Sequence, residues 1–532
     1  MKGGKMDNDY IALPKGSFEF VNSGTLSDEG LKTKSRSFFA DALLRFRKNK
    51  SSVVSAFIIL FLVLFAIFSP IISPYSVYDR YSKYQKKPPF AEGIAEMRLG
   101  ILDGGVRRDS QSELQLTQLR AIASETAHDP VIKILGSEEV REIYRGEERL
   151  TKYYSLRVNS YFAIGVEELN ISYEEYENIQ RWQDENGIQV IYPWVEASDA
   201  YKNASDKPPQ DFKIKSNVWY LCSDYKSSTP ILDENGDFIP AYSTDRKISG
   251  SYPDGTPVEY TSKMRVKGDG GDYIYAKAAS GSLKCRIEAY SYYKYLNDGR
   301  APTFLFGTDE YGADLFCAIG MGARFSLLFA LLVSAINLVI GAIYGAVQGY
   351  YGGITDLALD RLSDILSGVP FIVVATLFKL HLATRVGPVV SFLFAFVLTG
   401  WISTAALTRK QFYRFKGSEY VMAARTLGAS DRRIMLKHIF PNAIGTMITS
   451  CALVIPGVIS SEASLSYLGI VDLSEITGTS IGTLMASGQN SMAAAPHAML
   501  FPALFMSLLL ISFNLFGNGL RDAFNPSTKG EV

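Results

Sequence analysis

Cysteine and histidine are scarce in this sequence, and neither is spaced like the ligands of a metal site. The 532 residues include four cysteines and four histidines, without the paired spacing of zinc or haem ligands. The only Gly-Lys pair is Gly4-Lys5, followed by Met6, so the phosphate-binding motif Gly-x-x-x-x-Gly-Lys-[Ser/Thr] is missing. We therefore expect no metal site, no catalytic residue, no cofactor and no ATP hydrolysis in this chain.

The sequence also has no excess of positive or negative charge. Lys and Arg total 54 and Asp and Glu total 54, so the formal net charge is zero. No nucleic-acid-binding motif, long internal repeat or coiled-coil heptad stands out, and a balanced charge gives no support to a polyanionic partner. We expect no nucleic acid among the partners.

Charged residues are missing from several long stretches, although a fifth of the chain is charged. The first such stretch is 53–72, and about 20 apolar residues at about 1.5 Å each span a hydrocarbon core of about 30 Å. It is longer than the apolar part of a usual signal peptide, and Ser69-Pro70 does not resemble a cleavage site. The stretch predicts an uncleaved membrane-spanning helix.

Five further spans are expected in the C-terminal part, where charges are again rare. The second is the least regular, because Asp360, Arg361 and Asp364 fall at its start and Pro370 interrupts it. We expect these three charged residues to form a structural network at the cytoplasmic face. The predicted spans are 325–347, 359–380, 386–407, 443–461 and 498–516.

Basic residues in the short loops predict the orientation, since Lys and Arg near span ends stay on the cytoplasmic side. Four lie within 45–50 and eight within 409–437, whereas none occurs within 439–520. Lys379 and Arg385, between the third and fourth spans, run against the rule. Six crossings place both termini and the loop 415–442 in the cytoplasm, and residues 73–303 outside it.

The polar segment 73–303 has no spanning run and is large enough to fold by itself. Ser172 with Glu175 forms a capping-box pattern and Asn186-Gly187 a stop, which predicts a helix between them. Strand composition marks 188–195, 217–221, 272–278 and 284–293. The segment is therefore predicted to be an α+β domain.

Cys222 and Cys285 both lie in this predicted outer domain. A disulfide between them would be worth about 4 kcal/mol in the chain-entropy model. Their spacing alone does not distinguish this candidate disulfide from two unpaired thiols.

The stretch EYVMAARTLGASDRRIMLKHIFPN, residues 419–442, separates two apolar runs. Helix formers surround Ala423-Ala424, whose small side chains leave a flat surface, and Gly428 suits the left-handed turn that ends a helix. Ser430 is placed to cap a second helix, which Pro441 ends. The pattern predicts a helix-turn-helix with a small-residue knob joined to the next span. A solvated basic loop that merely obeys the orientation rule is the alternative.

The stretch resembles the coupling loop of binding-protein-dependent ABC importer permeases. The shared pattern is two alanines, three residues, a glycine and, after twelve more residues, a proline. The chain is similar in particular to the oligopeptide/dipeptide-type permeases of the C-subunit kind. The similar segments occur in the family's order and cover the first span and nearly all of 301–526. They are RFRKNKSSVVSAFIILFLVLFAIFSPIISPY, FGTDEYGADLF, GAVQGYYGGITDLALDRLSDILSGVP, EYVMAARTLGASDRRIMLKHIFPN, SSEASLSYLG and FNLFGNGLRDAFNP.

The resemblance implies an all-α polytopic membrane protein of six transmembrane helices with an ABC importer permease core. The residues themselves add the large α+β extracytoplasmic insert between the first and second spans. It implies a homologous second permease subunit, two ATPase subunits that bind ATP and Mg, and an extracytoplasmic substrate-binding protein or lipoprotein that delivers an oligopeptide or dipeptide. Closure of the ATPases would push the loop and drive alternating access. The residues that match the ATPase-coupling loop are Glu419, Ala423, Ala424, Arg425, Gly428, Ala429, Ser430, His438, Pro441 and Asn442.

Together these inferences divide the chain into five parts. Within the first part, Phe39, Ala42, Leu43 and Phe46 recur at helical spacing, which fits a helix on the inner membrane surface or one packed on the bundle. The parts are a cytoplasmic tail with this helix (1–52), the first span (53–72), the insert (73–303), the permease domain (304–520) with its coupling loop (415–442), and a cytoplasmic C-terminal tail (521–532).

The chain departs from the family pattern at three places. Met422 stands where the family usually has Glu, Phe440 where it usually has Leu, and the insert is much longer than usual. The first two put the strength or partner choice of ATPase docking in question, although Glu419 lies one helical turn before Met422. Glu462, an acid near the predicted outer end of a span, either lines the outer translocation path or caps a helix.

Two other functions compete with the import permease. A membrane-anchored receptor would use the insert to bind its ligand, but it leaves the coupling-loop pattern unexplained. An ion-coupled carrier would need charged groups within its spans, which are almost free of them.

Overall fold

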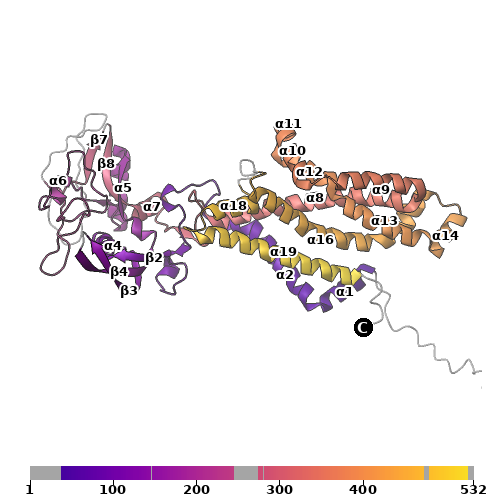
Figure 1. The fold of residues 1–532 in the computed structure, drawn as a ribbon, viewed down its shortest axis with the longest axis horizontal. Helices are drawn as coiled ribbons and strands as arrows, with labels where there is room; N and C mark the ends of the chain where they lie inside the picture. Colours follow the sequence, from indigo (N-terminus) through magenta and orange to yellow (C-terminus); the bar gives the residue numbers. More distant parts are fainter. Residues whose placement is uncertain (1–37, 145–146, 245–272, 280, 472–478, 525–532) are drawn as a thin grey trace, which may run out of the picture.

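The computed structural model describes residues 38–144, 147–244, 273–279, 281–471 and 479–524. The predicted N-terminal tail before residue 38 and the end of the C-terminal tail after residue 524 lie outside these residues. The described chain is elongated, with long helices toward one end and a mixed helix and sheet part at the other (Figure 1).

Long apolar helices form one part of the molecule. Five helical segments are long and apolar enough to cross a membrane: Lys50–Ile72, Leu315–Tyr351, Pro388–Lys416, Asp431–Tyr467 and Pro496–Phe524. The helices of this part are α1 (Phe38–Lys48), α2 (Lys50–Ile72), α8 (Leu315–Tyr351), α9 (Gly353–Ser367), α10 (Phe371–His381), α11 (Ala383–Val386), α12 (Pro388–Gly400), α13 (Ile402–Lys416), α14 (Glu419–Thr426), α15 (Asp431–Arg433), the π-helical η3 (Ile434–Ile439), α16 (Phe440–Tyr467), α18 (Ile481–Asn490) and α19 (Pro496–Phe524).

The predicted second span of the C-terminal part is broken. Helices α9 and α10 meet at an angle of 74°, and only the two together are long and apolar enough for a span. Pro370, the N-cap residue of α10, lies at the break, where its ring cannot continue the hydrogen bonding of α9. The described chain therefore has five candidate spans, or six if the bent pair crosses as one.

Apolar side chains fill the centre of this helical part and also cover its outside. The core includes Leu62 of α2, Phe329 of α8, Ile459 of α16 and Leu509 of α19, all at most 5% exposed. Large apolar side chains on the outer surface, such as Phe57 at 67%, are unusual for a protein in water and fit a lipid environment.

Helix α1 packs on this bundle. Ala42 and Phe46 are buried, whereas Leu43 is 61% exposed. The Phe46 ring meets that of Phe516 in α19, with centroids 5.4 Å apart. The helical stripe predicted in this segment therefore includes two residues that contact the bundle, as the packed-helix alternative requires.

A row of glycines brings α8 into close contact with α13. Gly341, Gly345 and Gly349 lie four residues apart on one face of α8, and a β-carbon built on each meets the backbone of α13. At Gly345 that carbon would lie 2.2 Å from the carbonyl oxygen of Ala405. Small residues at such spacing allow two membrane helices to approach closely.

We expect Gly345→Ala to destabilise the chain by about 1–3 kcal/mol, because the added methyl group forces α8 and α13 apart. The measurement is the midpoint of thermal unfolding of the detergent-solubilised protein. Gly457→Ala in α16 is the matched control, since a β-carbon there meets nothing within 4 Å. Equal midpoints for the two variants would contradict this account of the helix contact.

The described residues of the insert form three sheets and several short helices. Strand β1 (Phe90–Ala91) pairs with β9 (Thr303–Phe304); β2 (Gly105–Ser112), β4 (Glu147–Asn159) and β3 (Val131–Tyr144) form an antiparallel sheet in that order; β5 (Val166–Ile171), β8 (Ser282–Glu288) and β6 (Ile191–Tyr192) form another, with β7 (Ala276–Ala279) also paired to β8. The helices are η1 (Ser82–Tyr84), α3 (Glu92–Ala95), α4 (Glu113–Glu125), η2 (Phe162–Ile164), α5 (Tyr173–Asn186), α6 (Ala197–Ala200) and α7 (Ala289–Leu296).

The strand predictions in this part were only partly correct. Within 284–293 the strand ends at Glu288 and α7 follows at once, while 217–221 forms only isolated bridges, such as Tyr220 to Pro240. Helix α5 lies where it was predicted, with the Ser172 side chain accepting a hydrogen bond from the Glu175 N–H and Gly187 in the left-handed conformation. Tyr176 and Ile179 form the buried side of this helix.

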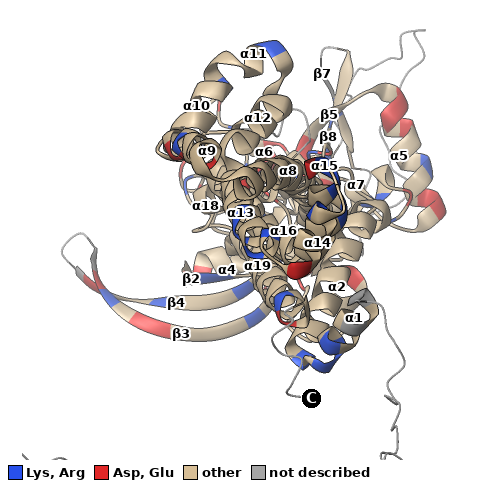
Figure 2. Cartoon of the chain, turned by 90° about the vertical axis from the view of Figure 1, so that its right-hand side faces the viewer, with Lys and Arg blue, Asp and Glu red and all other residues tan. Residues whose placement is uncertain are grey.

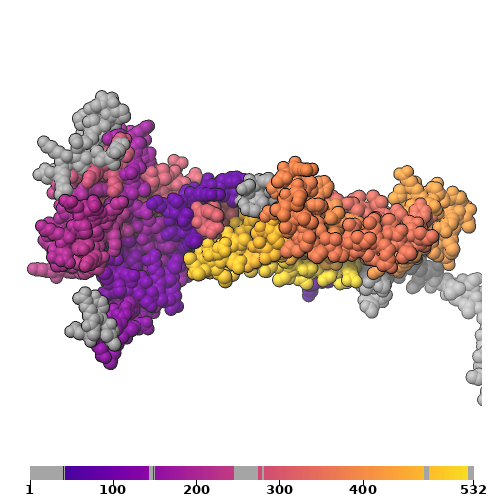
Figure 3. Space-filling model, turned by 45° about the horizontal axis from the view of Figure 1, so that its top comes forward, coloured from indigo at the N-terminus to yellow at the C-terminus, as the bar shows by residue number. Residues whose placement is uncertain are grey.

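A narrow junction connects the insert to the helical part (Figure 3). Asp314, the N-cap residue of α8, accepts hydrogen bonds from the N–H groups of Phe316 and Cys317 and from the Ser73 hydroxyl at 2.8 Å. Ser73 immediately follows α2, so this carboxylate joins the two ends of the insert. Burial raises the pKa of Asp314 to about 6.

Candidate functional site: the loop at the end of the helical part

The predicted knob lies at the end of the molecule opposite the sheets (Figure 1). Helix α14 carries Ala423-Ala424 and is followed by Gly428, which has a φ of 81°. The Gly428 N–H donates to the Arg425 carbonyl at 3.0 Å, and the Ala429 N–H donates to that of Ala424 at 3.1 Å. These bonds close the end of the helix in the way that a left-handed glycine permits.

Buried residues hold the knob firmly against the bundle. Val421, Ile434 and Ile439 are fully buried in one cluster with Tyr350 of α8 and Phe412 of α13. The Tyr350 hydroxyl donates to the Asp431 carboxylate at 2.5 Å. The knob therefore has a rigid attachment to two long helices.

The opposite surface of the knob is exposed and partly apolar. Leu427 is 87% exposed and Met422 51% exposed, and Ala423 lies open beside them. An exposed leucine at the tip of a well-anchored loop is suited to bury itself in a partner. Leu427 was not among the predicted loop residues, although its position directly before the capping glycine was the available signal.

The remaining predicted loop residues lie around this knob. Glu419 begins α14 and is exposed, as is Arg425. The Asn442 amide donates to the Tyr420 hydroxyl at 3.2 Å and to the His438 carbonyl at 2.9 Å, which ties α14 to the start of α16. Ser430 has the extended backbone of an N-cap residue before α15, but its side chain makes no capping hydrogen bond.

Pro441 does not end the second helix, contrary to our prediction. Helix α15 continues through the π-helical turn η3 into α16, so the chain is helical from Asp431 to Tyr467. A proline lacks the N–H of a regular helical bond, and a π-helical turn changes the bonding pattern just before it. The knob is thus continuous with a candidate span.

The two departures from the family pattern lie in different surroundings. Met422 is on the exposed surface of α14. Phe440 packs against the buried cluster that anchors the knob. The first departure therefore lies on the open surface of the knob, and the second lies where the knob is attached to the bundle.

A charged network links α9 to α13 near the same end. The Arg409 guanidinium donates to the Asp356 carboxylate at 2.6 Å and to that of Asp360 at 2.7 Å. Arg361 and Asp364, which we expected in one network with Asp360, pair with each other on the exposed surface. The pairing of Asp356 with Arg409 was not predicted, because it requires two helices to lie side by side.

Basic residues gather at the end of the molecule that carries the knob, as the view onto this end shows (Figure 2). They come from α1, α13 and α15, whose basic residues include Arg45, Arg414 and Arg432.

Glu462 lies inside the bundle, toward the end of α16 that is farther from the knob. Its carboxylate is 1% exposed and accepts hydrogen bonds from the Ser326 hydroxyl of α8 at 2.8 Å and from that of Ser466 at 3.1 Å. Because it lies within α16, it does not cap a helix. In this conformation the carboxylate instead joins α16 to α8.

Cys222 and Cys285 are free thiols in the structure. They are fully buried in two different apolar clusters of the insert. Burial raises the pKa of Cys222 to about 12 and that of Cys285 further still, which disfavours the reactive thiolate. The unpaired alternative therefore describes the structure. No group of His, Cys, Asp and Glu side chains suited to a metal occurs among the described residues.

Comparison with known families defines the class of this helical part. Residues 337–530 match the family described as "Binding-protein-dependent transport system inner membrane component". Residues 37–89 match "N-terminal TM domain of oligopeptide transport permease C". The chain is thus an inner-membrane component of the binding-protein-dependent transport class.

Individual relatives identify the family within this class. The chain is 36% identical to the "Oligopeptide transport system permease protein OppC" of Bacillus subtilis (strain 168) over 242 residues, which cover 45% of this chain and 78% of the relative. It is 35% identical to the "Dipeptide transport system permease protein DppC" of the same organism, over 42% of this chain and 69% of the relative. The chain belongs to the oligopeptide/dipeptide-type permease family of ABC importers.

Among solved structures, the chain is similar to one titled "Inward facing conformations of the MetNI methionine ABC transporter". The match covers 39% of this chain and 96% of that one, at 15% identity and a TM-score of 0.32.

Proposed function

We propose that this chain moves peptides across the cytoplasmic membrane by alternating access, as one of two homologous permease subunits driven by separate ATPase subunits. The exposed knob around Leu427, anchored to α8 and α13 and continuous with α16, is the observation that carries this proposal. Its permease family and the oligopeptide and dipeptide transport named for its relatives support a peptide substrate.

The ATPase subunits dock on the exposed surface of α14 and supply the bound ATP and Mg. Their closure pushes the surface formed by Met422, Ala423 and Leu427, and the helix from Asp431 to Tyr467 carries the movement through the bundle. The outer ends of α8 and α16 separate in the outward-open state. Glu462, which joins them in this structure, then lines the outer path.

The knob, α1 and the C-terminal tail face the cytoplasm, and the insert faces the outside. The basic residues near α13, α14 and α15 support this orientation, since such residues stay on the cytoplasmic side. The position of the insert at the opposite end of the molecule agrees with it.

Purification of the chain from its native membrane with its partners tests the assembly. We expect mass spectrometry to identify a second permease, two ATPases and a peptide-binding lipoprotein. Recovery of the chain without any ATPase, together with full peptide uptake in their absence, would overturn the proposal.

The insert also helps to seat the extracytoplasmic binding protein, and strands β3 and β4 are the part best placed to do so. Figure 2 shows them as a curved ribbon that projects to one side. Strand β2 accompanies β4 only as far as the pair Ser112 and Tyr153, so the ribbon beyond is two-stranded. A two-stranded ribbon is marginally stable alone in water, which favours a partner.

Replacing residues 139–152 by Asn-Gly should weaken binding of the partner lipoprotein, because it removes the two-stranded part of the ribbon. Glu138 and Tyr153 face one another across the ladder, so a two-residue hairpin turn can join them. The measurement is the dissociation constant of the binding protein for the complex in nanodiscs, and the midpoint of thermal unfolding is the control for folding. An unchanged constant with an unchanged midpoint would remove this role of the ribbon.

A further inference from the structure

The insert contains a polar pocket that the proposed function does not use. Its volume is about 430 Å³, and it lies between β2 and α4 on one side and β5 and the segment 215–220 on the other. The polar residues that line it include Arg108, Gln111, Gln115, Gln118, Lys215 and Asn217. Pockets for small ligands have volumes of about 300–1,000 Å³.

The register of β2 turns Arg108 into this pocket. Arg108 lies opposite Leu156, and Val106 lies opposite Val158; both partners are fully buried, so this face of the sheet is the inner one. Arg107 lies on the other face, where it pairs with Asp109. Since side chains alternate along a strand, neighbouring arginines of one strand have opposite surroundings.

A bulge in β2 adds a second side chain to the pocket. The register shifts between Arg108 and Gln111, and Ser110 has a φ of 54°. An extra residue in a strand reverses the alternation beyond it. Gln111 therefore lines the same pocket as Arg108, although it lies three positions further along the chain.

The pocket has two cationic side chains without protein partners. Among the described residues, the side chains of Arg108 and Lys215 make no hydrogen bond or ion pair. The acid in the lining, Glu167, is paired with Lys83 at 2.6 Å. Desolvation by the surrounding protein lowers the pKa of Arg108, as expected for a guanidinium with no carboxylate beside it.

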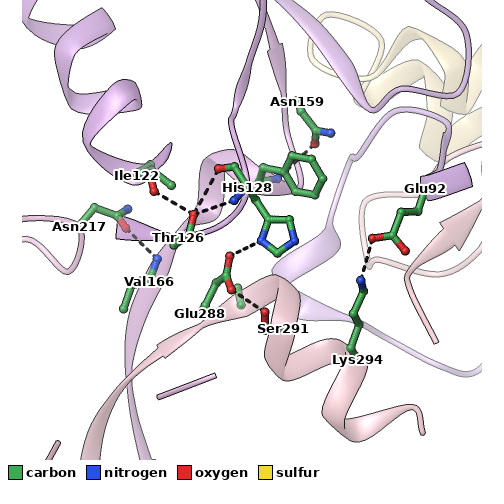
Figure 4. Close-up of polar contacts among 12 residues, drawn as sticks. Glu92, Ile122, Thr126, His128, Asn159, Val166, Asn217, Glu288, Ser291 and Lys294 are labelled. Atoms are coloured by element: carbon green, nitrogen blue, oxygen red, sulfur yellow. Dashed lines mark hydrogen bonds and ion pairs between the residues drawn. The ribbon is translucent and has the colours of Figure 1, made fainter. Parts of the chain in front are cut away.

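The amide groups around these cations are already engaged. The Asn217 side chain accepts from the Val166 N–H at 2.8 Å, as Figure 4 shows, and donates to the Ile164 carbonyl at 3.0 Å. The Gln118 amide donates to the Ser227 carbonyl at 3.1 Å. These bonds hold the walls of the pocket in place. Arg108 and Lys215 remain as the charged hydrogen-bond donors that line the pocket.

We propose that this pocket binds a small anion whose carboxylate or phosphate group lies against Arg108 and Lys215. Arginine and lysine form their strongest hydrogen bonds with such groups. One source of the anion is the carboxyl terminus of a short peptide, which rests on the proposed function; the other is free phosphate. In the first case the permease itself holds peptide on the outer side, in addition to the binding protein.

Isothermal titration of the purified full-length chain in detergent tests the pocket, with the dipeptide Ala-Ala, its C-terminal amide and inorganic phosphate as probes. We expect Arg108→Gln and Lys215→Gln each to weaken binding of the anionic probe at least tenfold. Arg107→Gln and Lys213→Gln remove the same charges from neighbouring exposed positions and should leave binding unchanged.

The titration distinguishes the two sources of the anion and tests whether the site exists. Binding of Ala-Ala but not of its amide supports a peptide carboxylate, and binding of phosphate alone supports a phosphate site. No binding of either anion by the wild-type chain, or equal affinities for the Arg108 and Arg107 variants, would overturn the proposal. The titration measures binding without any ATPase subunit. Its result therefore does not depend on whether the chain supports peptide uptake, so the two proposals can fail separately.

Discussion

Gly428→Pro is expected to leave the chain in the membrane and to abolish ATP-dependent peptide uptake. Gly428 has a φ of 81° and its N–H donates to the Arg425 carbonyl. Proline fixes φ near about −65° and has no N–H, so the turn between α14 and α15 cannot keep its shape. The surface around Leu427 would then be presented to the ATPase in a different orientation.

Uptake of a labelled peptide into proteoliposomes, with the partner subunits and ATP present, measures this effect. Gly428→Asn is the matched control, because asparagine tolerates the left-handed conformation and keeps the N–H. We expect the asparagine variant to retain most of the uptake and the proline variant to retain none. Undiminished transport by Gly428→Pro would show that the shape of the turn does not matter for coupling.

Local chemistry explains why this turn could be predicted from the sequence. The helix formers of α14, the glycine after it and the extended Ser430 act within a few residues of one another. The same holds for α5, whose cap and stop signals lie at its own ends. The apolar runs also predicted the candidate spans, because span length depends on the bilayer and not on the neighbouring helices.

Features that depend on distant parts of the chain escaped prediction. The strand predicted at 284–293 becomes helix α7 after Glu288, although its tyrosines favour a strand locally. Residues 132–142 of β3 are exposed, and only the second half of β4, around Leu156 and Val158, has the alternating pattern of a half-buried strand. The pairing of Arg409 with Asp356 arises only once α9 lies against α13.

The helix runs without a break from the knob into α16, and this continuity determines whether a push on the knob would reach the bundle. A second helix that stopped at Pro441 would end in a hinge, and a push on the knob would be lost in bending. The π-helical turn η3 instead keeps the chain helical across this proline. The buried residues Val421 and Ile434 keep the knob from moving separately from α8 and α13.

Leu427→Asp is expected to disrupt coupling without disturbing the fold. The leucine is 87% exposed, so its replacement costs the isolated chain almost no buried area. Under the proposed function, the same side chain would anchor the knob to the ATPase surface. Loss of a well-buried interface anchor costs about 2 kcal/mol or more, which corresponds to roughly a 25-fold weaker docking.

Two measurements separate docking from folding in this variant. The affinity of the purified ATPase subunits for the chain in nanodiscs should fall, and peptide-stimulated ATP hydrolysis should fall with it, while the midpoint of thermal unfolding stays the same. Leu296→Asp introduces the same change at a 58% exposed leucine of the insert, at the opposite end of the molecule, and should affect none of the three. If Leu427→Asp bound the ATPases as tightly as this control, the docking surface would have to lie elsewhere than on the tip of the knob.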